Sequence, residues 1–387
     1  MKVAFLHFEY PFGGGEMVTS NLSEYFTPVG CEVLVLACKF SGSENENIKF
    51  VTLPYEHKIN HKTNIDFMID FINTNQIDIL VLPGVYLKEI QRLKSHISAK
   101  IVFALHSMPM WEATNKVLVA QAKSSVSILK KLEWCFFQKI KYQFFKTHRS
   151  SILKLYKKTF SIVDAYVVLC DAYKEDMETI LGEKSSSKLF VISNSVKQHK
   201  DVSVYSKIKE LLYVGRLSYA DKRIDRLILV WKRLMSSFPD WSLRIVGDGP
   251  DAERLKDLVL SEAIERVYFE GYHKDVDKYY SSSPIICMTS SFEGWPLTLG
   301  EAQAYGVVPV AFNCSAGVED ILSPNGINGI LVPPFDLDTY AKELERLMNN
   351  DDERIKMAKA ALAKSKEYSL DVVGKKWLDL FSSLILK

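Results

Sequence analysis

Two glutamates in the segment EGWPLTLGE, Glu293 and Glu301, have the residue type and spacing of a polar binding site. An apolar run over residues 284–289 precedes them, Pro296 suits a first helical turn and Gly306 suits a helix end. We therefore expect Glu293 in a loop and Glu301 in the first turns of a helix, at the sheet edge where ligands bind. Carboxylates accept several hydrogen bonds from hydroxyl groups, and a helix N-terminus offers N–H groups to phosphate. The alternative is one capping and one solvated glutamate.

Two basic residues, Arg216 and Lys222, follow the apolar run over residues 210–215. A guanidinium can bind two phosphate oxygens at once, and two cations near strand ends can neutralise a diphosphate. A pair of solvated surface cations would look the same in sequence. The segment is therefore a candidate diphosphate site.

Glycine turns follow two of the apolar runs. Gly14 and Gly15, in PFGGGE, let the backbone turn sharply and present N–H groups at a helix start, where an anion is favoured. Their spacing is not GxGxxG, so it does not indicate a dinucleotide site. Gly247, in VGDGP, would let a ligand approach the backbone closely. A plain turn between strand and helix explains either segment equally well.

No metal site is predicted. Asp275 with Asp277, and Asp336 with Asp338, are formally DxD patterns, but each pair precedes an expected helix, where Asp is a common cap. The eight histidines show no spacing typical of metal ligands. His7 ends the first apolar run, and we expect it to be a hydrogen-bonded core or edge residue rather than a ligand-binding one.

Short apolar, β-branched runs alternate with helical patterns along the whole chain. Such runs indicate strands buried on both faces of a parallel sheet. The alternation predicts the doubly wound α/β class. The predicted strands are residues 2–8, 32–38, 48–53, 78–83, 100–105, 165–169, 189–193, 210–215, 242–246, 267–270, 284–289, 307–312 and 329–332.

The strand series restarts near residue 210, after a polar segment without a strand pattern. We therefore expect two Rossmann-like domains whose ligand crevices face a central cleft. The expected parts are an N-terminal domain (1–200) with a basic, aromatic helical insertion (about 119–160), a linker (197–209), a C-terminal domain (205–370), and a last helix (371–387) packing back on the N-terminal domain.

Composition excludes some classes of protein. The 387 residues are 47% hydrophobic, enough for each half to bury its own core, and the net charge of +2 argues against a nucleic-acid binder. The six cysteines lie far apart without a CxxC pair, which favours reduced thiols in a cytoplasmic protein. We expect neither a signal peptide nor a membrane-spanning helix.

With these motifs the sequence resembles glycosyltransferase family 4, which has the GT-B fold. The resemblance covers almost the full length and is strongest from Leu211 to Pro334. It is carried by GGGE, YVGRLSYADKRIDRLI, IVGDGP and SSFEGWPLTLGEAQAYGVVPVAF, and more weakly by DAYVVLCDA and VISNSV. The chain departs from the family at Arg223, where many members have glycine, and in a longer loop before Lys222. The resemblance therefore leaves open whether Lys222 or Arg223 points inward.

The resemblance implies a hexosyltransferase that retains the anomeric configuration. It would move a sugar from a nucleotide diphosphate sugar, commonly a UDP-sugar, to a saccharide or lipid-linked saccharide in glycan or polysaccharide biosynthesis, without a metal or other cofactor. By position, Glu301 would hold the ribose hydroxyls and Glu293 would face the donor sugar. His106, at the end of IVFALH, would lie near the same sugar.

The remaining implied contacts are to phosphate and sugar. Arg216 and Lys222 would clamp the diphosphate, and Gly14 or Gly15 would donate backbone N–H groups to the same phosphates. The other residues implied to line the donor are Gly247 and the run Trp295, Pro296, Leu297 and Thr298.

Other functions stay open on sequence grounds, since one fold supports several chemistries. One alternative is a nucleotide-sugar epimerase or another GT-B enzyme, such as a glycan phosphorylase, although no motif for a pyridoxal-phosphate lysine is evident. Another is a non-catalytic glycan-binding protein, although Glu293, Glu301, Arg216 and Lys222 are all present.

One segment, from about Lys123 to Lys158, is strongly basic and aromatic. It holds a single acid, Glu133. This composition predicts peripheral binding to an anionic membrane surface, on the inner face of the membrane, where a lipid-linked acceptor would be met. The alternative is a helical insertion whose aromatic rings pack on the N-terminal core. The ten basic residues are Lys123, Lys130, Lys131, Lys139, Lys141, Lys146, Arg149, Lys154, Lys157 and Lys158.

Overall fold

The computed structural model describes residues 1–11, 13–41, 45–124, 132–133, 136, 147–182 and 187–386. The chain forms two compact units, and each is described by itself. The first unit comprises Met1–Met110, His148–Ser195 and Tyr368–Lys387. The second unit comprises Trp111–Thr147 and Val196–Glu367.

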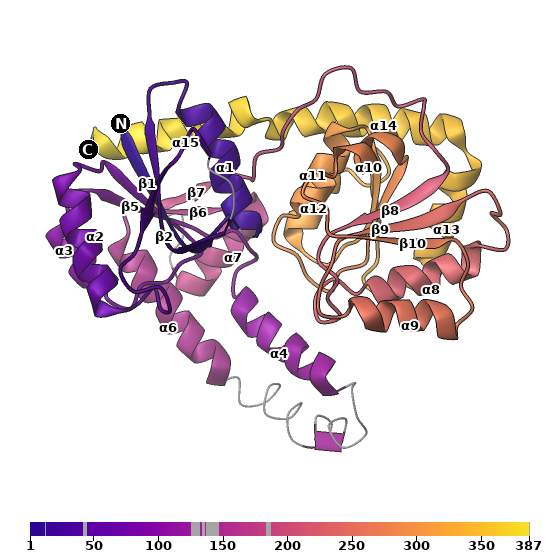
Figure 1. Ribbon diagram of the computed structural model, residues 1–387, viewed down its shortest axis with the longest axis horizontal. Coiled ribbons are helices and arrows are strands. Elements are labelled where there is room, and N and C mark those ends of the chain that lie inside the picture. The colour runs from indigo at the N-terminus through magenta and orange to yellow at the C-terminus, as the bar shows by residue number, and fades with distance from the viewer. Residues whose placement is uncertain are drawn as a thin grey trace. The chain divides into compact units, whose positions relative to one another are not determined.

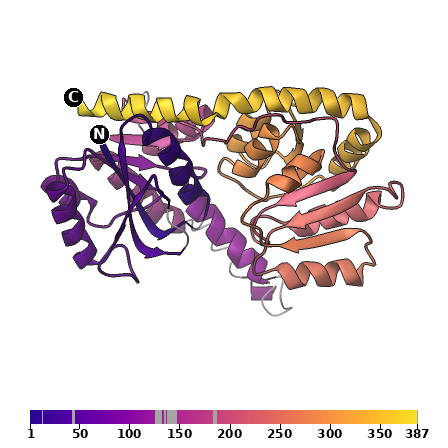
Figure 2. The ribbon, with the colours of Figure 1, turned by 45° about the horizontal axis from the view of Figure 1, so that its top comes forward.

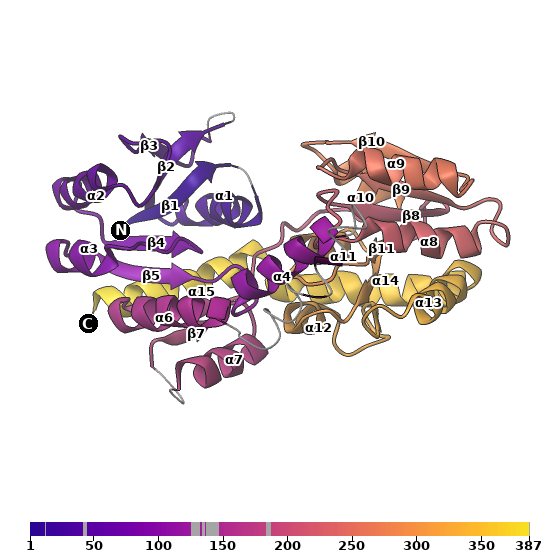
Figure 3. The same ribbon diagram turned by 90° about the horizontal axis from the view of Figure 1, so that it is seen from below.

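The first unit is built on a parallel sheet. In its described residues, seven strands run in the order β3-β2-β1-β4-β5-β6-β7, and Figure 3 shows the row from β3 to β5 (Figure 3). The chain order reverses between β1 and β4, so the carboxyl ends of these strands flank a topological switch point. The strands are β1 (Lys2–Tyr10), β2 (Glu32–Phe40), β3 (Lys49–Thr52), β4 (Ile79–Pro83), β5 (Lys100–Ala104), β6 (Ala165–Val168) and β7 (Leu189–Val191).

Helices connect these strands, and the last helix of the chain also belongs to this unit. Helix α15 (Leu370–Ile385) packs against α1 (Gly14–Phe26), where Gly374 leaves room for the ring of Tyr25 (Figures 1 and 2). A Cβ on Gly374 would lie 2.4 Å from that ring, so the two helices approach closely because this residue is glycine. The other helices of this unit are α2 (Lys62–Thr74), α3 (Ile90–His96), α6 (Thr147–Ile162) and α7 (Asp171–Leu181).

The second unit has the same architecture with a shorter sheet. Its described strands run parallel in the order β10-β9-β8-β11-β12-β13, so the switch point lies between β8 and β11. Residues of β8, β11 and β12 are almost entirely buried, as the continuous apolar runs predict. The strands are β8 (Glu210–Val214), β9 (Ser242–Val246), β10 (Val267–Gly271), β11 (Ile285–Met288), β12 (Val308–Phe312) and β13 (Ile330–Val332).

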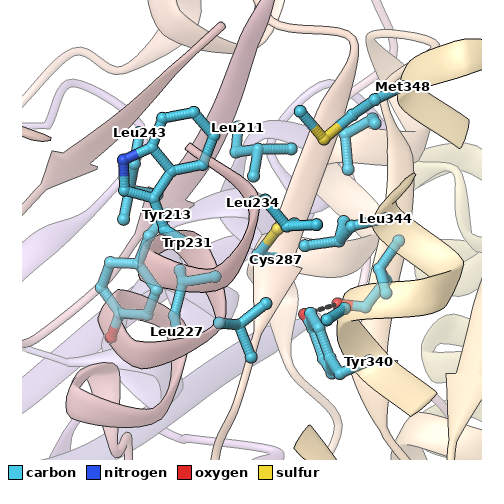
Figure 4. Packing of buried hydrophobic residues seen from close by; sticks show 14 of the residues in the cluster. Leu211, Tyr213, Leu227, Trp231, Leu234, Leu243, Cys287, Tyr340, Leu344 and Met348 are labelled. Carbon is cyan, nitrogen blue, oxygen red and sulfur yellow. Dashed lines mark hydrogen bonds between the residues drawn. The ribbon is translucent and has the colours of Figure 1, made fainter. Parts of the chain in front are cut away.

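Apolar faces of helices fill the core of the second unit. Trp231 of α8 packs with Leu243 of β9 and with Leu344 of α13 in one buried cluster (Figure 4). Helices α8 and α9 cover one face of the sheet, and α10 and α11 lie on the other (Figure 1). The helices are α4 (Trp111–Ser124), α8 (Ile224–Leu234), α9 (Ala252–Ser261), α10 (Asp277–Ser282), α11 (Leu297–Ala304), α12 (Ala316–Leu322), α13 (Leu337–Asn349) and α14 (Asp351–Ser365).

The fold class predicted from sequence is confirmed. Each of the thirteen predicted strands is present within about two residues at either end, and no helix or strand forms over residues 197–209. The DxD at Asp336 is a helix cap, since its carboxylate accepts hydrogen bonds from the backbone N–H groups of Asp338 and Thr339. Among the residues that the structure describes, no helix has the length and apolarity needed to cross a bilayer.

Most of the basic segment 123–158 lies outside the described residues. Its described C-terminal part belongs to α6, where Tyr156 and Phe160 are buried in the first unit. Lys154 and Lys157 of the same helix are exposed. Within the described residues of the segment, the ring of Tyr156 is buried and that of Phe136 is 65% exposed, so membrane binding by the segment stays a prediction.

Candidate functional site

The centre of the candidate site in the second unit is an ion pair between Lys222 and Glu293. The Lys222 ammonium donates to both carboxylate oxygens of Glu293, at 2.7 and 3.0 Å. The Ser290 hydroxyl donates to the same carboxylate at 2.6 Å. Because the Glu293 side chain is only 9% exposed, these contacts hold a carboxylate in one orientation away from bulk water.

The topology of the sheet explains why these two residues meet. Lys222 lies in the loop after β8, and Glu293 lies in the loop after β11. Strands β8 and β11 are neighbours in the sheet although their first residues, Glu210 and Ile285, lie far apart in the sequence. The pair therefore sits at the switch point, where open α/β sheets bind their ligands.

Asp221 connects the pair to the second predicted cation. Its carboxylate accepts a hydrogen bond from Arg216 at 2.8 Å, and its backbone carbonyl accepts one from the Ser291 N–H at 2.6 Å. Burial raises the pKa of Asp221, but Ser218 and the charges of Lys222 and Arg216 outweigh burial and hold that pKa below its ordinary value. Arg216 is 64% exposed, so its guanidinium can reach a ligand while it stays paired.

The electrostatics keep Lys222 charged. Burial lowers the pKa of the Lys222 ammonium, but the charge and hydrogen bonds of Glu293, with the charge of Asp221, outweigh burial and raise that pKa. A fixed positive charge at a sheet edge suits a ligand with phosphate groups.

Arg223 is directed elsewhere. Its guanidinium makes two hydrogen bonds to Asp225, at 2.9 and 2.8 Å, and stacks on the ring of Tyr219. Its backbone is left-handed, with φ of 51°, a conformation that glycine adopts without cost. Of the two neighbouring cations, Lys222 is the one that contacts Glu293.

Glu301 lies in α11, as predicted, and is partly buried. Its carboxylate accepts a hydrogen bond from the Tyr280 hydroxyl at 2.9 Å. Burial raises the pKa of Glu301; the Tyr280 hydrogen bond opposes this shift and the charge of Asp277 adds to it. Glu301 therefore has a fixed side chain with remaining acceptor positions, which suits neighbouring hydroxyl groups.

The residues between the two glutamates begin α11. Pro296 is the N-cap residue, and Leu297 and Thr298 open the helix, both partly exposed. The side chain of Trp295 is buried and donates its indole N–H to Asp320 at 2.9 Å. Gly247 has a packing reason to be glycine, since a Cβ there would lie 1.9 Å from the carbonyl oxygen of Gly215.

The predicted first-unit residues lie close to one another. Gly14 and Gly15 open α1 after β1, and a Cβ on Gly15 would lie 3.9 Å from the ring of His106, which follows β5. His7 is buried and hydrogen-bonded, as predicted: its ring nitrogens lie 2.9 Å from the Thr19 hydroxyl and 3.4 Å from the Glu16 carboxylate.

His106 is held neutral by its surroundings. Its Nδ1 lies 3.1 Å from the side-chain oxygen of Asn194. Burial lowers the pKa of His106 to about 4, although Asn194 opposes this shift. At neutral pH its ring therefore offers a hydrogen bond without a positive charge.

Several contacts were not predicted from sequence. Asp221, Ser290, Tyr280 and Asn194 each orient a predicted residue. Two of these four residues lie close in the sequence to a predicted site residue: Asp221 is next to Lys222, and Ser290 is three residues before Glu293. In the described part of the chain, no group of three or more His, Cys, Asp or Glu side chains is arranged to hold a metal ion.

The residues of this site in the second unit lie within a segment that matches a known family. Residues 194–364 match the family model described as glycosyl transferases group 1. An uncharacterized glycosyltransferase of Haemophilus influenzae is 38% identical over 170 residues, which are 44% of this chain and 48% of that protein. The amylovoran biosynthesis glycosyltransferase AmsD of Erwinia amylovora is 29% identical over 248 residues, covering 61% of this chain and 67% of AmsD. The first alignment thus spans about half of the relative, and the second about two thirds.

Solved structures share the fold over the whole length. S. aureus TarM superposes with a TM-score of 0.73 at 15% identity, covering 98% of both chains. Anabaena HepE, solved with UDP and glucose, superposes with a TM-score of 0.71 at 16% identity and covers 99% of this chain and all of HepE. The chain therefore has the GT-B fold. Residues 194–364 are in addition similar to the glycosyl transferases of group 1.

Proposed function

We propose that the protein is a retaining glycosyltransferase that transfers a sugar from a nucleoside diphosphate sugar, a UDP-sugar, to a saccharide or lipid-linked saccharide. The product would belong to a bacterial-type glycan or polysaccharide, as AmsD acts in amylovoran biosynthesis. The observation that carries the proposal is the Lys222–Glu293 pair at the switch point of the second sheet, within the matched residues 194–364.

The charges suit a diphosphate leaving group. As the bond between sugar and phosphate breaks, negative charge grows on the phosphate oxygens, and fixed cations stabilise it strongly where water is excluded. Lys222 and Arg216 supply that charge, and the N-terminus of α11 adds N–H groups of its first turn. HepE has been solved with UDP-glucose, which supports a uridine nucleotide as the first to test.

The two glutamates would bind different parts of the donor. Glu301, fixed by Tyr280, would accept hydrogen bonds from the ribose hydroxyls. Glu293, fixed by Lys222 and Ser290, would face the donor sugar and favour the positive charge that grows on its ring. The leaving phosphate would help to deprotonate the acceptor, which then attacks on the same face.

The first unit would supply further donor contacts. Gly14 or Gly15 would donate backbone N–H groups to the phosphates, and neutral His106 would hydrogen-bond the sugar without adding a charge. These roles rest on the family resemblance and on the grouping of the three residues within the first unit.

We also propose that no metal takes part and that the enzyme works at the cytoplasmic face of a membrane. The first part rests on Lys222 and Arg216, which replace the charge that a metal would supply. The second rests on the basic composition of residues 123–158, where each cation near an anionic surface adds about 1 kcal/mol of attraction.

One experiment tests the reaction. The protein is incubated with radiolabelled UDP-glucose, UDP-galactose and UDP-N-acetylglucosamine, with and without a lipid extract from polysaccharide-producing cells as acceptor. We expect the label to move to the acceptor with release of UDP. Conversion of the donor to its epimer, or phosphate-dependent cleavage of a glycan, would identify a different enzyme on the same fold. Binding without turnover of any donor would refute the proposal.

A further inference from the structure

The loop that carries Glu293 has no regular structure, yet its carboxylate needs a fixed orientation. The loop spans residues 289–296, between β11 and α11. Lys222 and Ser290 fix the carboxylate itself. They do not fix the backbone that follows it, Gly294 and Trp295, and a side chain is only as well placed as the backbone that bears it.

Helix α12, which follows the neighbouring strand β12, holds that backbone. The indole N–H of Trp295 donates to the Asp320 carboxylate at 2.9 Å. Trp295 is buried, with only 3% of its surface exposed. A hydrogen bond to a carboxylate is stronger than one to a neutral acceptor. The bond therefore ties the Glu293 loop to an element that comes later in the chain.

Two glycines complete this contact. A Cβ on Gly317, in the first turn of α12, would lie 1.7 Å from the carbonyl oxygen of Gly294. A Cβ on Gly300, in α11, would lie 3.2 Å from Cη2 of Trp295. The loop is thus packed between α11 and α12 at a spacing that larger residues would not permit.

We propose that Asp320 is a positioning residue: through the indole of Trp295 it fixes the loop that aims Glu293. Asp320 does not touch the donor in this proposal. Its role rests on the proposed function in one respect, that Glu293 acts on the donor sugar. Packing alone predicts a loss of stability on substitution, whereas positioning predicts a selective loss of turnover.

The test compares Asp320→Ala and Trp295→Phe with two controls. Asp320→Asn keeps an oxygen that can accept the indole N–H, and it should keep most of the turnover. Trp231→Phe removes another buried indole N–H of the same unit, which donates to the Glu265 carbonyl at 2.9 Å and not to a residue of α12. It should lower stability and leave kcat near the wild-type value.

Turnover and nucleotide binding are measured for each folded variant. We expect Asp320→Ala and Trp295→Phe each to lower kcat by about 10- to 100-fold, the effect of a displacement on the order of 1 Å in a catalytic group. The Kd of UDP, measured by calorimetry, should change by less than about threefold, since Glu301, Arg216 and Lys222 are untouched. The double variant should lose no more than either single variant, because both remove one interaction.

Hydrogen exchange of the backbone amides of residues 291–295 and 297 is a second measurement that needs no substrate. Asp320→Ala should accelerate their exchange, and Asp320→Asn and Trp231→Phe should not. Unchanged exchange in Asp320→Ala, or a kcat within twofold of the wild type, would overturn the proposal. So would a loss in Asp320→Asn equal to that in Asp320→Ala. If the wild type turns over no nucleotide sugar, the proposed function fails, and exchange still decides whether Asp320 fixes the loop.

Discussion

Replacing Glu301 with alanine tests the nucleotide site most directly. In the proposed complex its carboxylate accepts hydrogen bonds from the ribose hydroxyls, and a hydrogen bond to a charged group contributes about 1.5–3 kcal/mol. If that binding free energy is lost, the Kd of UDP rises by about 10- to 150-fold. Isothermal titration calorimetry of UDP with the purified variant measures the change.

The structure supplies the control for this substitution. Glu301→Ala also removes the acceptor of the Tyr280 hydroxyl, which is buried, so part of any effect would come from the protein itself. Tyr280→Phe breaks the same hydrogen bond and leaves the carboxylate in place. We expect Tyr280→Phe to weaken UDP binding far less than Glu301→Ala does. Equal affinity of Glu301→Ala and wild type for UDP would refute the assignment of Glu301 to the ribose.

Four further outcomes are expected. Glu293→Ala should lower kcat more than it raises the Kd of UDP, because its proposed partner is the sugar; steady-state kinetics with calorimetry would show the opposite pattern if Glu293 bound the nucleotide. Activity should survive chelation by EDTA, and complete loss restored by magnesium or manganese would contradict a metal-free reaction. Burial lowers the pKa of His106 to about 4 from an ordinary 6.5, so between these values the unfolded chain binds a proton that the native protein does not. Stability should therefore fall as pH drops from about 6.5 to 4, and thermal unfolding of His106→Gln should show a shallower fall. The protein should sediment with anionic vesicles at low salt and not with neutral ones, and binding that survived charge reversal within the segment 123–158 would exclude docking through it. The residues for that reversal are Lys139, Lys141, Lys146 and Arg149.

The order of elements could be predicted from the sequence because burial on both faces of a parallel sheet leaves a local pattern. The run over residues 307–312, VVPVAF, is continuously apolar, and residues 308–312 of it form β12. The same holds for the start of α11 at Leu297, since Pro296 and Gly306 mark its ends by their backbone preferences. These signals depend only on neighbouring residues.

Pairing between distant residues was decided by tertiary structure alone. The sequence favoured Lys222 but left open whether Lys222 or Arg223 points inward. The guanidinium of Arg223, which has a left-handed backbone, bonds to Asp225, and Lys222 contacts Glu293. No spacing predicts that the Asp320 carboxylate accepts the indole N–H of Trp295, because α11 and β12 lie between the two residues in the sequence. Local preferences fix which residues form each element; which side chains meet depends on strand order and on the close packing that brings separate loops to one edge.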